Sequence, residues 1–500
     1  MFKKILIANR GEIAIRVAKA CKELGISTVG VYSTIDKKSL HLRFMDETVW
    51  IGDSPAISSY LNIEAILEAA KKTKAEAIHP GYGFLAENEK FAKACEDAGI
   101  IFIGPSSKAL SLVGDKVASR NTVKKVDVPI IPGMHMTSTD ISLFKKTAEK
   151  TGYPVMIKAS MGGGGKGMRV VHNEKDLEKS IAISQREALS SFGDDSIYLE
   201  KYIEEPRHIE FQVLRDNYGN CVHLFERECS IQRRHQKIIE ETPSPALNDE
   251  LRIEMGEAAK KVIEASDYTT AGTVEFLLDK NKKFYFLEVN ARIQVEHPIT
   301  EMVTGVDLVR EQIKIAACEK LLLSQDQIKQ NGHAIETRIY AEDPDNNFVP
   351  SPGKILFLSE PKGPGIRVDS GIYQGCNIPP HYDPILSKLI VWSENRNMSI
   401  VRISENLKEY IILGIKTNIG YLKRIIDSKN FASGDYDTHF IDEHEESLLP
   451  KQEKLNIALI AGALNKSLGI SKRAKEYDSQ YSQMTTPWQE IGKWEICSLS

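Results

Sequence analysis

The sequence has few of the features that mark secreted, membrane-spanning or zinc-binding proteins. Its seven cysteines are odd in number and scattered, without a Cys-x-x-Cys pair, which argues against a disulfide framework or zinc site and favours a reducing cytoplasm. No apolar run approaches the roughly 18 residues of a membrane helix, and the N-terminal run is too short for a secretory signal. The formal net charge is only −4, so no overall field attracts nucleic acid or an anionic membrane. We therefore expect a cytoplasmic, multidomain protein with neither partner.

The first 32 residues also lack a dinucleotide-binding turn, although they predict a strand–helix–strand unit. Residues 5–9 and 28–32 have the pattern of buried strands, and residues 12–24 that of an amphipathic helix. Such a unit favours a parallel sheet. The intervening Asn9-Arg10-Gly11-Glu12 has no Gly-x-Gly-x-x-Gly, the turn that a pyrophosphate needs. The pattern predicts a Rossmann-like layer without a bound dinucleotide.

A glycine-rich segment follows a predicted strand that ends in Lys158. Residues 160–171 contain five glycines and Lys166, a composition that suits a mobile flap whose backbone amides approach phosphate oxygens. It is not a Walker motif, because no Lys-Ser/Thr pair opens a helix after it. A flexible hairpin without a ligand is the alternative. Lys116 and Lys158 lie upstream as candidate phosphate partners.

Two later stretches have conspicuous polar patterns. His208, Glu210 and Gln212 share one face of an alternating run, which by default predicts a solvated outer face. Residues 229–237 form a dense basic patch in a nearly neutral protein. This patch is either an anion site or a solvated loop.

Residues 272–292 predict an antiparallel hairpin, because two apolar, aromatic-rich runs flank a polar turn at 280–283. That turn would pair Leu277 with Phe286.

The same register places Glu275 directly opposite Glu288, with Asn290 two residues further along that side. Opposed carboxylates about 5 Å apart repel one another. Together with an amide oxygen they suit a hard cation such as magnesium. An exposed strand face remains the alternative, since a shift of one residue would send Glu288 to the other side.

Five short motifs together resemble one family. They occur in the order and at the spacing of the biotin carboxylase component of biotin-dependent carboxylases, which are members of the ATP-grasp superfamily. The resemblance covers roughly residues 1–447. Its motifs are Asn9-Arg10-Gly11-Glu12-Ile13-Ala14, His79-Pro80-Gly81-Tyr82-Gly83, the glycine-rich segment, Gln232-Arg233-Arg234-His235-Gln236-Lys237 and Arg292-Ile293-Gln294-Val295-Glu296-His297-Pro298.

The resemblance implies an α/β and α+β fold with three domains, and the tail that follows them departs from the family pattern. A predicted apolar helix at 455–468, a polar stretch and two tryptophans in the tail could dock a partner protein or pack back on the body. The implied parts are a Rossmann-like N-terminal biotin carboxylase domain at 1–114, an ATP-grasp domain at 115–330 with a mobile glycine-rich lid at about 132–203, and a C-terminal biotin carboxylase domain at 331–447. The tail at 448–500 lies beyond them.

The implied activity is ATP- and bicarbonate-dependent carboxylation of biotin on a carrier protein, through carboxyphosphate. This is the first half-reaction of an acyl-CoA or pyruvate carboxylase. The implied cofactors are ATP and Mg²⁺ or Mn²⁺, with biotin supplied in trans. Because the sequence has no Met-Lys-Met biotinylation site and is short for a transferase, we expect the biotin carboxyl carrier protein and the carboxyltransferase on separate chains. A homodimer is also expected. Another ATP-grasp ligase that forms an acyl-phosphate, or an inactive scaffold, is the alternative, and the final acceptor stays open.

The resemblance also implies roles for individual residues. Glu296 matches the general base for bicarbonate, and Arg338 matches the arginine that stabilises enolate-like biotin; Tyr82 is a weaker candidate for the biotin side. Bicarbonate would be held by Lys237, Arg292, Gln294 and Val295, so that Lys237, Arg292, Glu296 and Arg338 form the catalytic set. Metal ligands would be Glu275, Glu288 and Asn290. ATP would contact Lys116, Lys158, Gly162, Gly163, Gly164, Gly165, Lys166, Gly167, Glu200, Lys201, Ile203, His208, Gln232, His235 and Leu277, besides Glu275 and Glu288.

Overall fold

A computed structural model of the chain describes residues 1–134, 136–159, 168–449 and 459–464. The chain divides into two compact units, 1–448 and 449–500. In the second unit, residues 459–464 are helical, within the predicted tail helix. The predicted flap glycines and Lys166, and the tail tryptophans, lie outside the described ranges. Among the helices of those ranges, none is long and apolar enough to cross a membrane.

The N-terminal sheet is parallel and has the strand order β3-β2-β1-β4-β5. Its central strand carries Ile5, Leu6 and Ile7, all fully buried, because helices and loops cover both faces of such a sheet. The predicted strand–helix–strand unit is confirmed. The elements are β1 (Lys4–Ile7), α1 (Gly11–Glu23), β2 (Ser27–Tyr32), β3 (Glu47–Trp50), α2 (Ile63–Thr73), β4 (Ala77–His79), α3 (Glu89–Asp97), β5 (Ile101–Phe102), α4 (Ser107–Gly114) and α5 (Lys116–Lys124).

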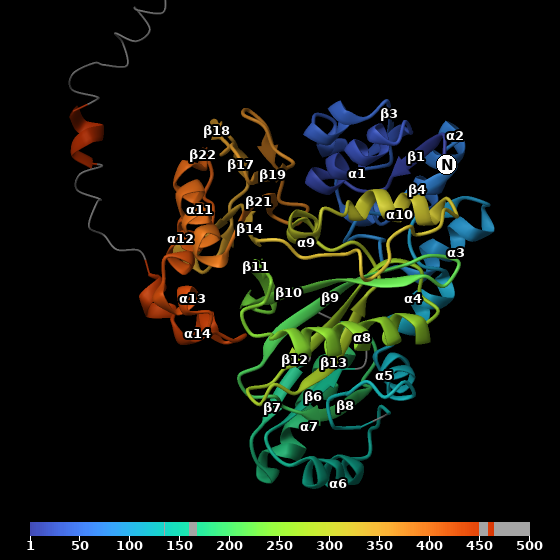
Figure 1. The fold of residues 1–500 in the computed structure, drawn as a ribbon, viewed down its shortest axis with the longest axis vertical. Coiled ribbons are helices and arrows are strands. Elements are labelled where there is room, and N and C mark those ends of the chain that lie inside the picture. Colours follow the sequence, from blue (N-terminus) through green and yellow to red (C-terminus); the bar gives the residue numbers. More distant parts are fainter. Residues whose placement is uncertain (135, 160–167, 450–458, 465–500) are drawn as a thin grey trace, which may run out of the picture. The chain divides into compact units, whose positions relative to one another are not determined.

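A small three-stranded antiparallel layer forms its own apolar core and projects downwards in Figure 1. Val155, Ile157 and Leu199 are fully buried in it. The order is β7-β6-β8, built from β6 (Val155–Ala159), β7 (Met168–Val171) and β8 (Ile197–Lys201), with α6 (Ile141–Thr151) and α7 (Leu177–Phe192) against it.

An eight-stranded antiparallel sheet connects the middle of the chain to its C-terminal part, in the order β13-β12-β9-β10-β11-β14-β21-β19. Helix α8 contacts β9, β10 and β12, whereas α9 contacts β10, β11, β14 and β21. The bounds are β9 (Arg207–Arg215), β10 (Cys221–Arg233), β11 (Gln236–Thr242), α8 (Asp249–Ala265), β12 (Thr270–Leu278), β13 (Phe284–Asn290), α9 (His297–Thr304), α10 (Leu308–Ala316), β14 (His333–Tyr340), β19 (Ile366–Ser370) and β21 (Ile385–Ser393).

The interior position of β9 overturns the expected solvated face. His208 is 7% exposed, and Glu210 and Gln212 are 0% exposed. Because β9 lies between β12 and β10 in a covered sheet, its polar alternation marks a buried polar cluster instead of a water-facing surface. The basic stretch at 229–237 is likewise no loop, since it spans the end of β10, a tight turn and the start of β11.

The C-terminal part packs on β14 and β21 through short strands and helices. Glu241 ties it to β11: Arg396 donates two hydrogen bonds of 2.7 and 2.9 Å to this carboxylate, and His333 Nε2 lies 2.7 Å from Oε2. Burial alone would raise the pKa of Glu241, but His333 and Arg396 lower it to about 2. The remaining elements are β15 (Glu342–Asp343), β16 (Val349–Pro350), β17 (Gly353–Lys354), β18 (Phe357–Ser359), β20 (Asn377–Ile378), α11 (Arg396–Glu409), β22 (Ile411–Leu413), α12 (Ile419–Ile426), α13 (Lys429–Ser433) and α14 (Phe440–Glu443).

Candidate active site

A cavity of about 460 Å³ is lined by residues of both the three-stranded layer and the eight-stranded sheet. Its apolar lining includes Met156, Tyr198, Leu277 and Phe286, a surface suited to a planar base. The predicted residues that line it are Lys116, Lys158, Glu200, Lys201, Ile203, His208, Gln232, His235, Lys237, Leu277, Glu275 and Glu288. Asn290, Arg292, Gln294, Val295, Glu296, Arg338 and Tyr82 are not among its described lining residues.

Cations gather around Glu200 in this cavity. Its carboxylate lies 2.5 Å from Lys158 Nζ and also pairs with Arg120. Burial would raise the pKa of Glu200, but Lys158 and Arg120 outweigh it and lower the pKa. Sequence reasoning missed Arg120. It follows Lys116 by four residues, the spacing that places two side chains on one face of a helix, and α5 begins at Lys116 behind the Asp115 cap. Lys201 instead donates to the Gly152 and Tyr153 carbonyls at 3.1 and 3.0 Å.

The hairpin brings Glu275 opposite Glu288, but not through the predicted register. Leu277 pairs with Tyr285 and not with Phe286, so that part of the prediction is wrong. The reason is a tighter turn followed by a β-bulge: the ladder passes from the Phe276–Phe286 pair to the Glu275–Glu288 pair, which leaves Leu287 as the extra residue.

The expected metal ligands are only partly brought together. Burial and then the neighbouring Glu275 raise the pKa of Glu288, as expected for two facing carboxylates. Asn290 Oδ1 accepts a hydrogen bond of 3.0 Å from Arg292, however. In the described part of the chain, His208, Glu210 and Glu275 form one group whose possible ligand atoms lie within 4.8 Å of one another. This group includes neither Glu288 nor Asn290.

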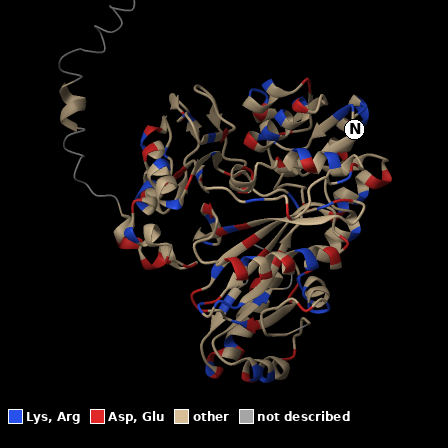
Figure 2. Ribbon diagram, in the orientation of Figure 1, with Lys and Arg blue, Asp and Glu red and all other residues tan. Residues whose placement is uncertain are grey.

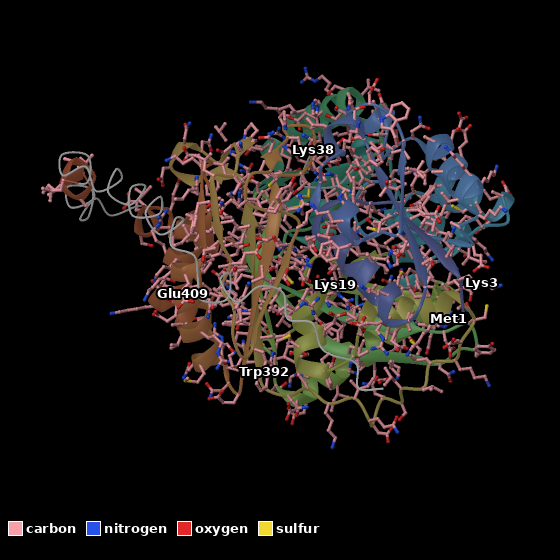
Figure 3. All side chains as sticks on the ribbon, turned by 90° about the horizontal axis from the view of Figure 1, so that it is seen from above. Met1, Lys3, Lys19, Lys38, Trp392 and Glu409 are labelled. Atoms are coloured by element: carbon pink, nitrogen blue, oxygen red, sulfur yellow. The ribbon has the colours of Figure 1, made fainter. Side chains whose placement is uncertain are left out.

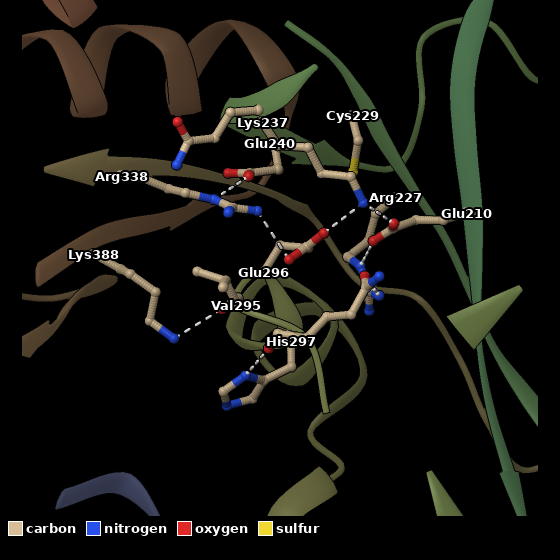
Figure 4. Close-up of polar contacts among 12 residues, drawn as sticks. Glu210, Arg227, Cys229, Lys237, Glu240, Val295, Glu296, His297, Arg338 and Lys388 are labelled. Atoms are coloured by element: carbon tan, nitrogen blue, oxygen red, sulfur yellow. Dashed lines mark hydrogen bonds and ion pairs between the residues drawn. The ribbon is translucent and has the colours of Figure 1, made fainter. Parts of the chain in front are cut away.

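Lys237, which lines the cavity, is the centre of an ionic cluster (Figure 4). Its ammonium group donates to Glu275 at 2.9 Å, to Glu296 at 2.7 Å and to Glu210. Burial would lower the pKa of Lys237, but the carboxylates raise it well above its ordinary value. The tight turn at Arg234 and His235, both with positive φ, directs β11 back so that Lys237 enters the cluster.

Glu296 lies between two cations, which Figure 4 shows on either side of its carboxylate. Lys237 holds Oε1, and Arg338 Nη2 donates to Oε2 at 3.0 Å. Burial would raise the pKa of Glu296, but Lys237, Arg338 and the nearby Arg227 hold it well below the usual range. The buried carboxylate is therefore ionised.

Arg338 is 7% exposed, unlike most lone strand arginines. Its Nε donates to Glu240 at 2.6 Å, a partner that sequence reasoning missed. Burial raises the pKa of Glu240 to about 7 despite Arg338. Glu240 lies opposite Glu336 across β11 and β14. In the sequence both look like surface glutamates, and only their neighbours in the tertiary structure show that they are buried.

The other expected bicarbonate residues lie next to this cluster. Arg292 contacts Glu87 at 3.1 Å, and Gln294 donates to Glu275 at 3.2 Å. Val295 contributes its carbonyl, which accepts from Lys388 at 2.8 Å.

Two buried cations support these residues and were missed from the sequence. Arg227 is 0% exposed and donates to Gln294 at 2.9 Å and Gln212 at 2.8 Å. Lys388, also fully buried, pairs across the strands with Arg338. Its ammonium lies 6.0 Å from the Tyr82 ring centroid, which places Tyr82 beside the same region. The sequence signal that could have identified Arg227 and Lys388 is a charged residue inside an apolar strand pattern.

The fold and the site fit an enzyme that binds a phosphorylated nucleotide, because one cavity is lined by both sheets, by Lys116 and Lys158, and by the facing carboxylates Glu275 and Glu288. Comparison with protein families gives three consecutive matches. They are biotin carboxylase, N-terminal domain, at 1–110; carbamoyl-phosphate synthase L chain, ATP binding domain, at 115–324; and biotin carboxylase C-terminal domain at 336–443.

Individual proteins of high sequence identity support the same family. The chain is 52% identical over 442 residues to a Nostoc biotin carboxylase, covering 88% of this chain and 99% of that protein. It is 53% identical to a pyruvate carboxylase subunit of Methanothermobacter thermautotrophicus (91% and 92% covered). It is 49% identical to the alpha chain of the mitochondrial methylcrotonoyl-CoA carboxylase of Dictyostelium discoideum over 497 residues, which is 99% of this chain and 70% of that protein.

One similar solved structure is the biotin carboxylase domain dimer of Hydrogenobacter thermophilus 2-oxoglutarate carboxylase, in complex with MgADP, ADP and bicarbonate. Its TM-score is 0.87 at 48% sequence identity, and the match covers 90% of this chain and 99% of that chain. The chain belongs to the biotin carboxylase family. It is an ATP-dependent ligase whose reaction is the carboxylation of biotin, and neither a different acyl-phosphate-forming ligase nor an inactive scaffold is favoured.

Proposed function

We propose that the buried Lys237–Glu296–Arg338 cluster carries out the carboxylation of biotin, with ATP and bicarbonate as co-substrates and carboxyphosphate as intermediate. The observation that carries this proposal is a carboxylate, that of Glu296, which is 2% exposed and is held between two cations. The cluster borders the cavity of about 460 Å³, because Lys237 and Glu275 belong to both.

Glu296 acts as the general base in this proposal. Its ion pairs with Lys237 and Arg338 favour the charged carboxylate, which can take the bicarbonate proton as a bicarbonate oxygen attacks the γ-phosphorus and the bond to ADP breaks. Lys237 and Arg292 supply the positive charge that orients the anion. Gln294 and the Val295 backbone complete its pocket.

Arg338 stabilises the negative charge that develops on the biotin ureido oxygen. Its two carboxylate partners, Glu240 and Glu296, fix the guanidinium plane in advance. Tyr82 borders the biotin side through its contact with Lys388.

Lys116 and Lys158 bind ATP phosphates, together with the flap at 162–167. Magnesium, when bound, would offset charge on those phosphates. Glu275 and Glu288 fit it, because a cation between them would relieve the repulsion that raises the pKa of Glu288. We retain Asn290 as the third ligand.

Partners and domain limits complete the proposal. Biotin arrives on a carrier protein, a carboxyltransferase uses the product, and the chain forms a homodimer, as supported by the dimeric neighbour. We propose the domain limits 1–114, 115–330 and 331–447, which the three family matches support.

The six described cysteines are free thiols, which fits the cytoplasm. Sedimentation analysis tests the dimer.

ADP release by the purified protein tests the reaction. We expect release that requires bicarbonate and is stimulated by free biotin. With ¹⁸O-labelled bicarbonate, one label should appear in the phosphate released, because the attacking oxygen stays bonded to phosphorus. ADP release without bicarbonate dependence, or unlabelled phosphate, would contradict the proposal.

A further inference from the structure

A second cavity, separate from the nucleotide site, is strongly cationic. It measures about 530 Å³ and lies between residues 34–40 of the N-terminal part and residues 371–386 of the C-terminal part. Arg10, Lys37, Lys38 and Lys354 line it, whereas Asp383 is the single carboxylate among its described lining residues. We call this cavity the cationic groove. In the view of Figure 2, residues of both charge signs are spread over most of the described chain.

Three of these four cations are free to meet a partner. Lys37, Lys38 and Lys354 are exposed, and within the described ranges none of them forms an ion pair. Arg10 differs, because its guanidinium is held by Asp36 at 2.6 Å. The groove therefore carries uncompensated positive charge in a chain whose net charge is −4, so its local field favours an acidic partner.

The groove is built by contacts that are distant in sequence. Tyr373 donates from its hydroxyl to the Lys38 carbonyl at 2.9 Å, across 335 residues, and Arg43 lies over the Tyr373 ring at 4.1 Å. Lys38 is labelled in Figure 3. Ile35, which lines the same groove, is 43% exposed. An exposed isoleucine among exposed lysines suits a protein partner better than a small anion, which needs converging buried donors.

The inner wall of the groove adjoins the strand that carries Arg338. Ile385 lines the groove and pairs with Tyr340, two residues beyond Arg338 on β14. Ala341 donates to the Pro384 carbonyl at 2.9 Å, which holds the groove wall against that strand. A protein seated in the groove would thus lie beside the arginine that meets biotin.

We propose that the cationic groove docks an acidic face of the biotin-bearing carrier domain and so delivers its biotinyl-lysine towards Arg338. The inference rests on the proposed function, because it presumes that biotin arrives on a protein. Docking by charge raises the encounter rate and lowers KM for the carrier without entering the chemistry.

Biotinyl-lysine peptides test the docking. Three peptides of equal length place glutamates, glutamines or lysines around the biotinyl-lysine, and each is titrated in the ADP-release assay. We expect KM for the glutamate peptide to be about tenfold below that of the glutamine peptide at low salt, with the preference lost at high salt.

The variant with Lys37→Glu, Lys38→Glu and Lys354→Glu should lose the preference or reverse it, while kcat and KM for free biotin stay unchanged. The matched control reverses the exposed lysines Lys3, Lys71 and Lys72 and should keep the preference. Thermal melts confirm that both proteins fold.

Equal KM values for the three peptides with the unchanged protein, or a preference that survives in the groove variant, would overturn the docking. Fluorescence anisotropy of labelled peptides measures the same preference without turnover. If ADP release fails to respond even to free biotin, the proposed function falls, and anisotropy still decides whether the groove binds the acidic peptide.

Discussion

Replacing Glu296 by glutamine separates the chemical role of this residue from its structural one. The substitution keeps the shape of the side chain and removes its charge and basicity. Loss of a general base lowers kcat by about 10² to 10⁴. We therefore expect bicarbonate-dependent ADP release to fall by at least two orders of magnitude.

The structural cost of Glu296→Gln is small by comparison. Lys237 keeps Glu275 at 2.9 Å, and Arg338 keeps Glu240 at 2.6 Å, so neither cation is left buried without a carboxylate. The expected loss in free energy of unfolding is about 1–3 kcal/mol, the range for one altered buried hydrogen-bonded group. A buried charge left without any partner would cost about 3–5 kcal/mol.

The assay measures ADP release at saturating ATP, with urea unfolding of the same preparation. Glu226→Gln is the matched control, because Glu226 is also buried and meets Arg252 at 3.0 Å through both oxygens, outside the Lys237 cluster. It should lose stability but keep kcat. A Glu296→Gln protein with more than half of the original kcat would refute the assignment of the base, and equal losses of kcat in both variants would refute the separation of roles.

Three further substitutions test other parts of the site and fold. Glu288→Gln should raise the Mg²⁺ concentration for half-maximal ADP release about tenfold or more without lowering the urea midpoint, because burial already disfavours its charge; a lowered midpoint with unchanged Mg²⁺ dependence would make Glu288 structural. Lys158→Gln should raise KM for ATP about tenfold or more, the value of one charged hydrogen bond, and an unchanged KM would exclude phosphate contact. Glu241→Gln should flatten the pH dependence of stability: a pKa lowered to about 2 gives stability that is present above about pH 4.5 and is lost as pH falls towards 2. Urea midpoints from pH 7 to 3 check this, and equal slopes would contradict it.

The sequence predicted the site best where a motif lies on one continuous stretch. The hairpin pairs Glu275 with Glu288 as expected, but only because two register shifts cancel, and no local sequence pattern predicts them. The pairing nearest the turn is shifted by one residue and the bulge at Leu287 shifts it back. Local patterns specify alternation, whereas bulges are settled by how the sheet packs.

Burial was the property that periodicity misjudged. His208, Glu210 and Gln212 alternate like a solvated strand, and Arg338 resembles a surface residue, yet all four are buried. A polar alternation is the same whether water or other charged groups face it. Arg227, Glu240 and Lys388 went unnoticed for this reason, since their partners come from strands far away in the chain.

The sequence by itself therefore determined the class of this protein: its order of elements, its motifs, and the residue types from which a site could be built. Those features depend on contacts between near neighbours and on composition. Only the tertiary structure decided which charges compensate one another, because Lys237, Glu296 and Arg338 lie on three separate segments. Their pKa values, and so their ability to act as base or electrostatic clamp, exist only once the eight-stranded sheet has brought these segments together and excluded water from between them.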